Sequence, residues 1–248
     1  MNAIQISAVT HRGKVRKDNE DSIAVGGFMS SAAAGHPVQL VAGDGYPVGC
    51  IVADGLGGHA EGGRASRIAA RIISDAILLA GSADCVAGAI NDANSAIYQE
   101  MTCAGAWQGM GTTVVAAVFG NGELTCVNVG DSRCYQVIGQ TMVQLSVDDS
   151  PVPVPGQPEG AGQTIVTQTL GGTRAPVALR PHVHVMPIEA RDRFLLCSDG
   201  LTDVVDLDAI EQCLATADDT SAVQQMLDAA LDAGAPDNIS IVLVTILA

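Results

Sequence analysis

The stretch VGCIVADGLGGHAEGG (residues 48–63) places an apolar run, an acidic turn and a glycine-rich loop in immediate succession. Its first six residues are apolar and partly β-branched, which favours a strand. Asp54 and Gly55 follow that strand directly, and beyond the glycines Ile68 and Ile72 recur at helical spacing. Because Asp-Gly at a strand end is common turn chemistry, this stretch alone predicts a strand, a turn and a helix.

The combination of an apolar run and an acid at its edge recurs along the chain. TCVNVGDS (125–132) and RFLLCSDG (193–200) end in an acid, and in APDNISIVLV (235–244) the acid precedes the run. Several strand ends can meet at one rim of a sheet and gather carboxylates into a site for a hard cation. The acids concerned are Asp54, Asp131, Asp199 and Asp237, together with Glu20 and Asp21 before the run SIAV.

Composition restricts the class of protein. The chain has 248 residues, of which 48% are hydrophobic and only 3% aromatic, so the core must be built from Val, Ile, Leu and Ala. The net charge of −15 is either a device for solubility or in part the clustered acids, and it argues against binding nucleic acid or anionic lipid. Seven cysteines without metal-ligand spacing, no apolar signal core and no run of spanning length predict a cytoplasmic protein without a membrane span.

Turn signals and helical patterns predict the architecture. Asn-Gly at 121–122 and Gly-Gln at 139–140 mark hairpins, so the strands around them should be antiparallel. Helical patterns come in consecutive pairs, which favours an α+β sandwich with helices outside the sheets. Stretches 26–36 and 43–45 are expected to be loops. The expected strands are 3–9, 22–25, 38–42, 48–53, 112–119, 123–129, 132–138, 141–145, 182–186, 193–197 and 239–247, and helices are expected after the loop at 55–63 and over 84–103, 206–215 and 219–233.

Six motifs in a fixed order resemble the metal-dependent protein phosphatases, the type 2C serine/threonine phosphatases, and in particular their bacterial single-domain members. The motifs are VRKDNEDS (15–22), VADGLGGHAEGG (52–63), MGTT (110–113), VGDSR (129–133), LLCSDGLTD (195–203) and APDNIS (235–240). The resemblance covers nearly the whole chain. It implies one catalytic domain over residues 1–248, folded as a four-layer αββα sandwich of two mainly antiparallel sheets flanked by pairs of helices.

The resemblance assigns the first metal ligands. By motif position, Asp54 bridges two metal ions and the backbone carbonyl of Gly55 binds one of them. Asp199 and Asp237 complete the first site, and Asn238 is expected to orient Asp237. Ligation by oxygen alone suits Mg²⁺ or Mn²⁺, and the lack of Cys/His ligand spacing argues against zinc.

The same resemblance implies further site residues. Glu20 and Asp21 act through metal-bound waters, and Asp131 matches a ligand of a third, weaker metal. Arg16 takes the place of the phosphate-binding arginine, since a guanidinium fork matches two phosphate oxygens; otherwise it is a solvated ion-pair partner. His59 either helps to protonate the leaving alkoxide or only caps the following helix.

One segment departs from the family pattern. Bacterial members carry Asp-His-Ser followed by a longer helical flap, whereas this chain has Asp148-Asp149-Ser150 followed by a proline-rich stretch. We therefore expect residues 147–163 to form either a plain surface loop or a remodelled active-site flap.

The expected function is hydrolysis of phosphoserine and phosphothreonine in proteins by metal-activated water, without a phospho-enzyme intermediate. The resemblance implies two Mn²⁺ or Mg²⁺ ions and a possible third, and phosphoprotein partners made by a serine/threonine kinase of eukaryotic type. A monomer is expected. Two alternatives stay open: a metal-dependent phosphoesterase acting on small molecules, and a non-catalytic relative that binds phosphoproteins.

Overall fold

The computed structural model describes residues 3–31, 35–43, 47–57, 60–79, 83–104, 109–150, 165–215 and 218–248. Two six-stranded sheets and a small three-stranded sheet make up its β-structure, and all neighbouring strands in them run antiparallel. In spatial order the first sheet consists of β11 (Thr141–Gln144), β10 (Arg133–Ile138), β14 (Arg193–Cys197), β15 (Ile239–Ile246), β1 (Ile4–His11) and β4 (Val38–Ala42).

The second sheet and the third sheet complete the strands. The second has the order β13 (His182–Pro187), β9 (Glu123–Val129), β8 (Val114–Gly120), β5 (Val48–Ala53), β2 (Ser22–Val25) and β3 (Phe28–Ser30). The third consists of β12 (Leu170–Gly171), β7 (Gly111–Thr112) and β6 (Gly55–Leu56). The helices are α1 (Ala60–Leu79), α2 (Ala83–Ala104), α3 (Asp199–Thr202), α4 (Leu207–Leu214) and α5 (Asp219–Asp232).

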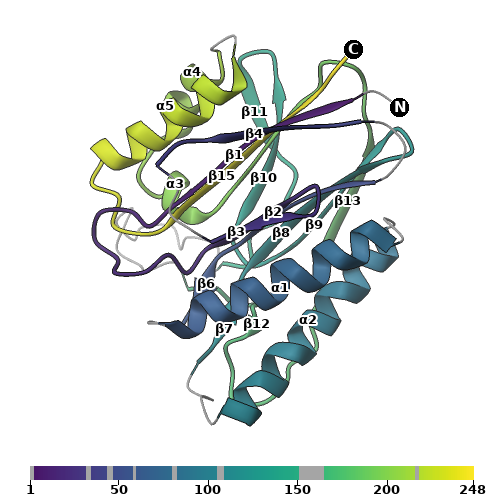
Figure 1. Ribbon diagram of the computed structural model, residues 1–248, viewed down its shortest axis with the longest axis vertical. Coiled ribbons are helices and arrows are strands. Elements are labelled where there is room, and N and C mark those ends of the chain that lie inside the picture. The colour runs from purple at the N-terminus through teal and green to yellow at the C-terminus, as the bar shows by residue number, and fades with distance from the viewer. Residues whose placement is uncertain are drawn as a thin grey trace, which may run out of the picture.

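The two large sheets pack face to face with helices outside them. Figure 1 shows α1 and α2 on one outer side and α4 and α5 on the opposite side. Alternation along β5 explains how one strand serves two cores: Cys50 and Val52 face the other sheet, and Ile51 faces the helix pair. A third cluster joins the first sheet to α3, α4 and α5. The prediction of an α+β fold with mainly antiparallel sheets is confirmed.

Most of the predicted elements are present, and the exceptions are local. At the predicted hairpin Asn121 and Gly122 have φ of 54° and 79°, as a two-residue turn requires. The prediction of a loop over 26–36 was wrong for Phe28–Ser30, which forms the exposed edge strand β3 behind a Gly-Gly turn. The strand expected over 112–119 is divided into β7 and β8, and α3 was not predicted. Among the described residues, no helix is long and apolar enough to cross a membrane.

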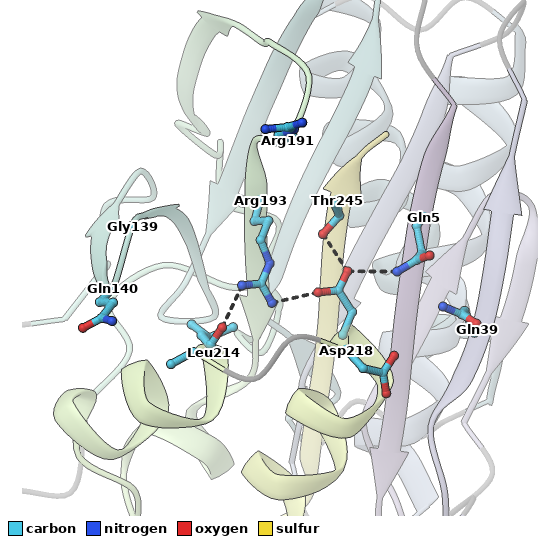
Figure 2. Close-up of a pocket in the computed structure, with 11 residues that line it drawn as sticks. Gln5, Gln39, Gly139, Gln140, Arg191, Arg193, Leu214, Asp218 and Thr245 are labelled. Carbon is cyan, nitrogen blue, oxygen red and sulfur yellow. Dashed lines mark hydrogen bonds and ion pairs between the residues drawn. The ribbon is translucent and has the colours of Figure 1, made fainter. Parts of the chain in front are cut away.

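A network of one ion pair and several hydrogen bonds attaches the beginning of α5 and the end of α4 to the first sheet (Figure 2). Nη2 of Arg193 lies 2.7 Å from Oδ1 of Asp219, and Nη1 donates to the carbonyl of Leu214 at 2.7 Å. Oδ2 of Asp219 accepts hydrogen bonds from Gln5 and Thr245 at 3.1 and 2.6 Å. Three adjacent strands, β1, β15 and β14, are therefore joined to the first turn of α5.

The core between the sheets makes a stability prediction. Phe194 is 0% exposed and its ring centroid lies 5.5 Å from that of Phe119. We expect Phe194→Ala to lower the free energy of unfolding by about 3–5 kcal/mol, because it leaves a cavity where the sheets meet. Urea unfolding measures this. Phe28→Ala, at a side chain that is 67% exposed, is the matched control, and an equal loss in both variants would contradict the assignment of this core.

Candidate metal centre

Antiparallel pairing brings the predicted acids to one end of the two sheets. Asp54 directly follows β5, and Asp21 directly precedes the neighbouring strand β2, in which Ser22 pairs with Ala53. In the other sheet Asp199 follows β14 and Asp237 precedes its neighbour β15. Since adjacent strands run in opposite directions, an acid after one strand and an acid before the next lie at the same edge.

Asp54 and Asp199, one from each large sheet, affect each other's pKa. Burial, followed by the charges of Asp21 and Asp199, raises the pKa of Asp54 well above its ordinary value. Burial also raises the pKa of Asp199. Burial and neighbouring negative charge thus favour the neutral forms of these two acids, whereas a bound cation would favour their charged forms.

Asp21 is the most deeply buried acid of the group. It is 0% exposed, and its Oδ2 accepts hydrogen bonds from Ser198 at 2.9 Å and Ser240 at 2.7 Å. Burial raises its pKa to about 7, although these two hydrogen bonds oppose the shift. Ser198 directly follows β14 and Ser240 lies in β15, so Asp21 also links the two sheets.

The hydrogen bonding of the carboxylate oxygens shows whether the site suits a cation. Within the described part of the chain, Oδ1 of Asp21, Oδ2 of Asp131 and Oδ1 of Asp199 are buried and have no hydrogen-bond partner. A buried oxygen without a donor is costly, and a hard cation would satisfy it. No three His, Cys, Asp or Glu side chains among the described residues already stand in a ligand arrangement. The observation that fits Mn²⁺ or Mg²⁺ is therefore the set of buried carboxylate oxygens without donors.

Asn238 has a different task from the one predicted. The carboxylate of Asp237 accepts from the backbone N–H of Asn238 at 2.8 Å, whereas the Asn238 side chain reaches the segment 12–20. Its Oδ1 accepts from the N–H of Glu20 at 2.8 Å, and its Nδ2 donates to the carbonyls of Arg12 and Asp18 at 2.8 and 3.0 Å. The amide thus holds the loop that carries Glu20 and Arg16.

Gly55 lies where three backbone segments meet. A methyl group on Gly55 would lie 2.4 Å from the carbonyl of Gly62 and 2.5 Å from that of Glu20. The carbonyl of Asp54 accepts a hydrogen bond from the hydroxyl of Thr112 at 2.7 Å and another from the backbone N–H of Thr113 at 2.9 Å. Only glycine allows this close approach, and the contacts orient the backbone of the ADG motif.

Arg16 reaches the acid cluster from the loop 12–20. Its Nη2 lies 2.5 Å from Oδ2 of Asp237, and the side chains of the pair are 46% and 36% exposed. The structure thus places the predicted phosphate-binding arginine against a predicted metal ligand. A cation on Asp237 would compete with this ion pair and free the guanidinium.

Asp131 belongs to a neighbouring group of polar side chains. It is 3% exposed, and burial, followed by the charge of Asp199, raises its pKa to about 7. Oδ2 of Asp149 accepts from the N–H of Gly130 at 2.9 Å, and its Oδ1 lies 2.9 Å from Nε2 of His182. Asp149 therefore secures the turn that carries Asp131.

Two acids of this region had no role in the sequence-based prediction. Asp149 was noted only as a departure from the family motif, and Asp203 only as the last letter of LLCSDGLTD. The charge of Asp203 contributes to the raised pKa values of Asp131 and Asp199. The spacing of four residues from Asp199 could have indicated it, since α3 places such residues on one face. His59 and most of the predicted flap 147–163 lie outside the described residues.

Comparison with known proteins identifies the family of this arrangement. The family model described as protein phosphatase 2C matches residues 37–241. The serine/threonine protein phosphatase PstP of Mycobacterium tuberculosis is 29% identical over 98% of this chain, which spans 45% of that relative's length. The serine/threonine phosphatase stp of Listeria welshimeri is 31% identical over 95% of this chain and 93% of its own.

A solved structure has the same fold as this chain and belongs to one of these relatives. The catalytic domain of PstP in complex with two manganese ions superposes with a TM-score of 0.81 at 28% identity, covering 99% of this chain and all of that one. The sequence match, the antiparallel sandwich and the acids at its rim agree with one another. The chain belongs to the protein phosphatase 2C family.

Proposed function

We propose that this chain is a Mn²⁺- or Mg²⁺-dependent protein phosphatase that hydrolyses phosphoserine and phosphothreonine. The observation that carries the proposal is the group of acids at the rim of the two sheets, with three buried carboxylate oxygens that have no donor among the described residues. The manganese complex of the PstP catalytic domain and the names of the relatives support it.

The proposed ligands follow the geometry of the rim. Asp54, Asp199 and Asp237 would hold the first ions with the carbonyl of Gly55, which follows the Asp54 carbonyl that Thr112 and Thr113 hold. Glu20 and Asp21 would act through water, and Asp131 would hold a third ion. Two such ions, when bound, supply Lewis acidity that lowers the pKa of a water and aims it at phosphorus.

Arg16 would bind the phosphoryl oxygens. Its guanidinium is partly exposed and lies 2.5 Å from Asp237, so it already stands at the rim where the phosphate would arrive. When Asp237 is engaged elsewhere, the fork can turn to two phosphate oxygens and stabilise the charge that develops on them. His59 is kept in the proposal as the group that protonates the leaving alkoxide.

Attack by water agrees with the state of the buried cysteines. Burial raises the pKa of the Cys197 thiol to about 12, and that of Cys50 is raised for the same reason. Thiols in this state are not nucleophiles near pH 7. The proposal includes a single domain over residues 1–248, a cytoplasmic monomer, and substrates that a serine/threonine kinase of eukaryotic type has phosphorylated.

Removal of one ligand tests the reaction. We expect Asp54→Asn and Asp199→Asn each to lower the Mn²⁺-dependent hydrolysis of p-nitrophenyl phosphate and of a phosphothreonine peptide by about 100-fold or more, because charge stabilisation by the ions is lost. Phosphate release measures both substrates. Asp228→Asn, an exposed acid on α5, is the control and should retain full activity. Retained activity in both site variants would refute the mechanism.

Chelation tests the site without turnover. The raised pKa values of Asp21 and Asp131 mean that the folded, metal-free protein binds more protons than the unfolded chain between about pH 4 and 7. In EDTA, stability should therefore fall as pH rises through this window, and the melting temperature should be lower at pH 8 than at pH 5.5. Differential scanning fluorimetry measures it.

Two comparisons complete the chelation experiment. Asp131→Asn removes one group that must ionise, so its melting temperature in EDTA should depend less on pH, whereas Asp228→Asn should keep the wild-type dependence. Added Mn²⁺ should raise the melting temperature most at pH 8, where the carboxylates are ionised. A metal-free protein that becomes more stable from pH 5.5 to 8 would contradict the assigned cluster.

A further inference from the structure

The basic residues of this acidic chain are concentrated in two segments beside the metal centre. The chain has 12 lysines and arginines against a net charge of −15. Seven of them are Arg12, Lys14, Arg16 and Lys17 in the loop between β1 and β2, and Arg64, Arg67 and Arg71 on α1. The loop carries Arg16, which the proposed reaction uses, but nothing in that reaction uses the arginines of α1.

Arg64, Arg67 and Arg71 form a stripe on the exposed face of α1. Their spacing of three and four residues puts them on one side of the helix, and all three are exposed. At 1.5 Å per residue the stripe is about 10 Å long, the length of about three residues of an extended peptide. We call this set the α1 arginine stripe.

The stripe begins at the metal centre. The hydroxyl of Ser66, between the first two arginines, donates to the carbonyl of Glu20 at 2.5 Å. A methyl group on Gly63 would lie 3.2 Å from Nη1 of Arg67 and 3.4 Å from Cα of Glu20, so the guanidinium lies close to the ligand-bearing loop. Figure 1 shows α1 starting beside β6 and β7 and running away from them. A peptide with its phosphate at the rim could follow this path.

Two of the three arginines have charge available for a partner. Arg64 forms an ion pair with Glu100 of α2. In contrast, Arg67 and Arg71 make no hydrogen bond or ion pair with any residue that the structure describes. Both residues are exposed, so their charge is open to a partner even on a chain of net charge −15.

A groove lies beneath the stripe. It has a volume of about 600 Å³ and runs between α1 and α2, with Ile68, Ile72 and Ala96 among its apolar residues. The arginines form one wall of it, and Gln99 and Glu100 belong to the other. The second wall carries an acid, but Glu100 is paired with Arg64. The wall of arginines beside apolar residues therefore suits a peptide that carries acidic side chains.

We infer that the α1 arginine stripe is a docking site for acidic residues that flank the phosphorylated residue of a protein substrate. The inference rests on the proposed phosphatase function and specifies its substrate class. Charge complementarity selects the occupant: Arg67 and Arg71 bind carboxylates of the flanking segment while the phosphate lies at the metal centre. Arg64 is left paired with Glu100, so the specificity lies in the other two.

The test compares three substrates in Mn²⁺ buffer. These are a phosphothreonine peptide with Asp and Glu on both sides, the same peptide with neutral flanks, and p-nitrophenyl phosphate. Arg67→Glu/Arg71→Glu should lower kcat/KM for the acidic peptide about tenfold, since two attractive pairs become repulsive. The other two substrates should change less than about twofold. Added salt should slow the acidic peptide for the wild type and not for the variant.

Arg191→Glu is the matched control for charge. Arg191 is exposed and lies beside a different pocket, near the start of β14 (Figure 2). It should leave all three rates unchanged, and it is compared with Arg67→Glu alone and with Arg71→Glu alone, each of which changes the net charge by the same amount. Equal loss with Arg191→Glu would show a long-range effect of net charge and overturn the docking site. Equal loss on p-nitrophenyl phosphate would show damage to the metal centre and overturn it as well.

Failure of the proposed function is distinguishable from failure of the docking site. If the wild type hydrolyses none of the substrates, the phosphatase proposal fails. The fluorescently labelled acidic peptide then keeps its phosphate in the same buffer, so its binding can still be measured. Its fluorescence polarisation then decides: weaker binding by Arg67→Glu/Arg71→Glu supports the stripe, and equal binding overturns it. Stronger binding of a single-stranded oligonucleotide than of the peptide would make the stripe a nucleic-acid contact and the inference wrong.

Discussion

Repulsion between acids at the shared rim of two sheets is the constraint on which the rest of the structure depends. Burial and the charges of neighbouring acids, Asp237 among them, raise the pKa values of Asp21, Asp54 and Asp199. The sheets hold them there because their backbones are paired over many residues on both sides. A bound cation would relieve this repulsion, because it favours the charged forms of the carboxylates.

The contacts that support the acids come mainly from neutral side chains. Ser198 and Ser240 donate to Asp21, and the Asn238 amide fixes the loop with Glu20 through three backbone groups. Thr112 and Thr113 orient the carbonyl of Asp54. Neutral donors thus hold the acids in place without neutralising them, which leaves oxygens for a cation. A salt bridge to each acid would have stabilised the fold and removed the ligands.

Charge is distributed over the surface in a way that matches this centre. An acidic chain disfavours anionic partners in general, whereas basic residues are concentrated on the loop 12–17 and on α1, both of which contact the Glu20 region. Local positive charge next to the rim attracts a phosphorylated segment, and the global negative charge keeps other polyanions away. The sequence shows that these arginines exist. Their closeness to the rim follows from the packing of Gly62 against Gly55 and of Gly63 against the backbone of Glu20.

The sequence by itself determined the strands, the hairpins and the candidate acids, because apolar runs, turn residues and motif order are local properties of the chain. It did not determine β3 or α3, since an exposed three-residue edge and a single helical turn leave little periodic signal. The true partners of Asn238, Arg16 and Asp149 were decided only by the tertiary structure. Each of these side chains binds a group that is distant in sequence, 221 residues away for Arg16 and Asp237, and only the packing of the two sheets brings such groups within hydrogen-bonding distance.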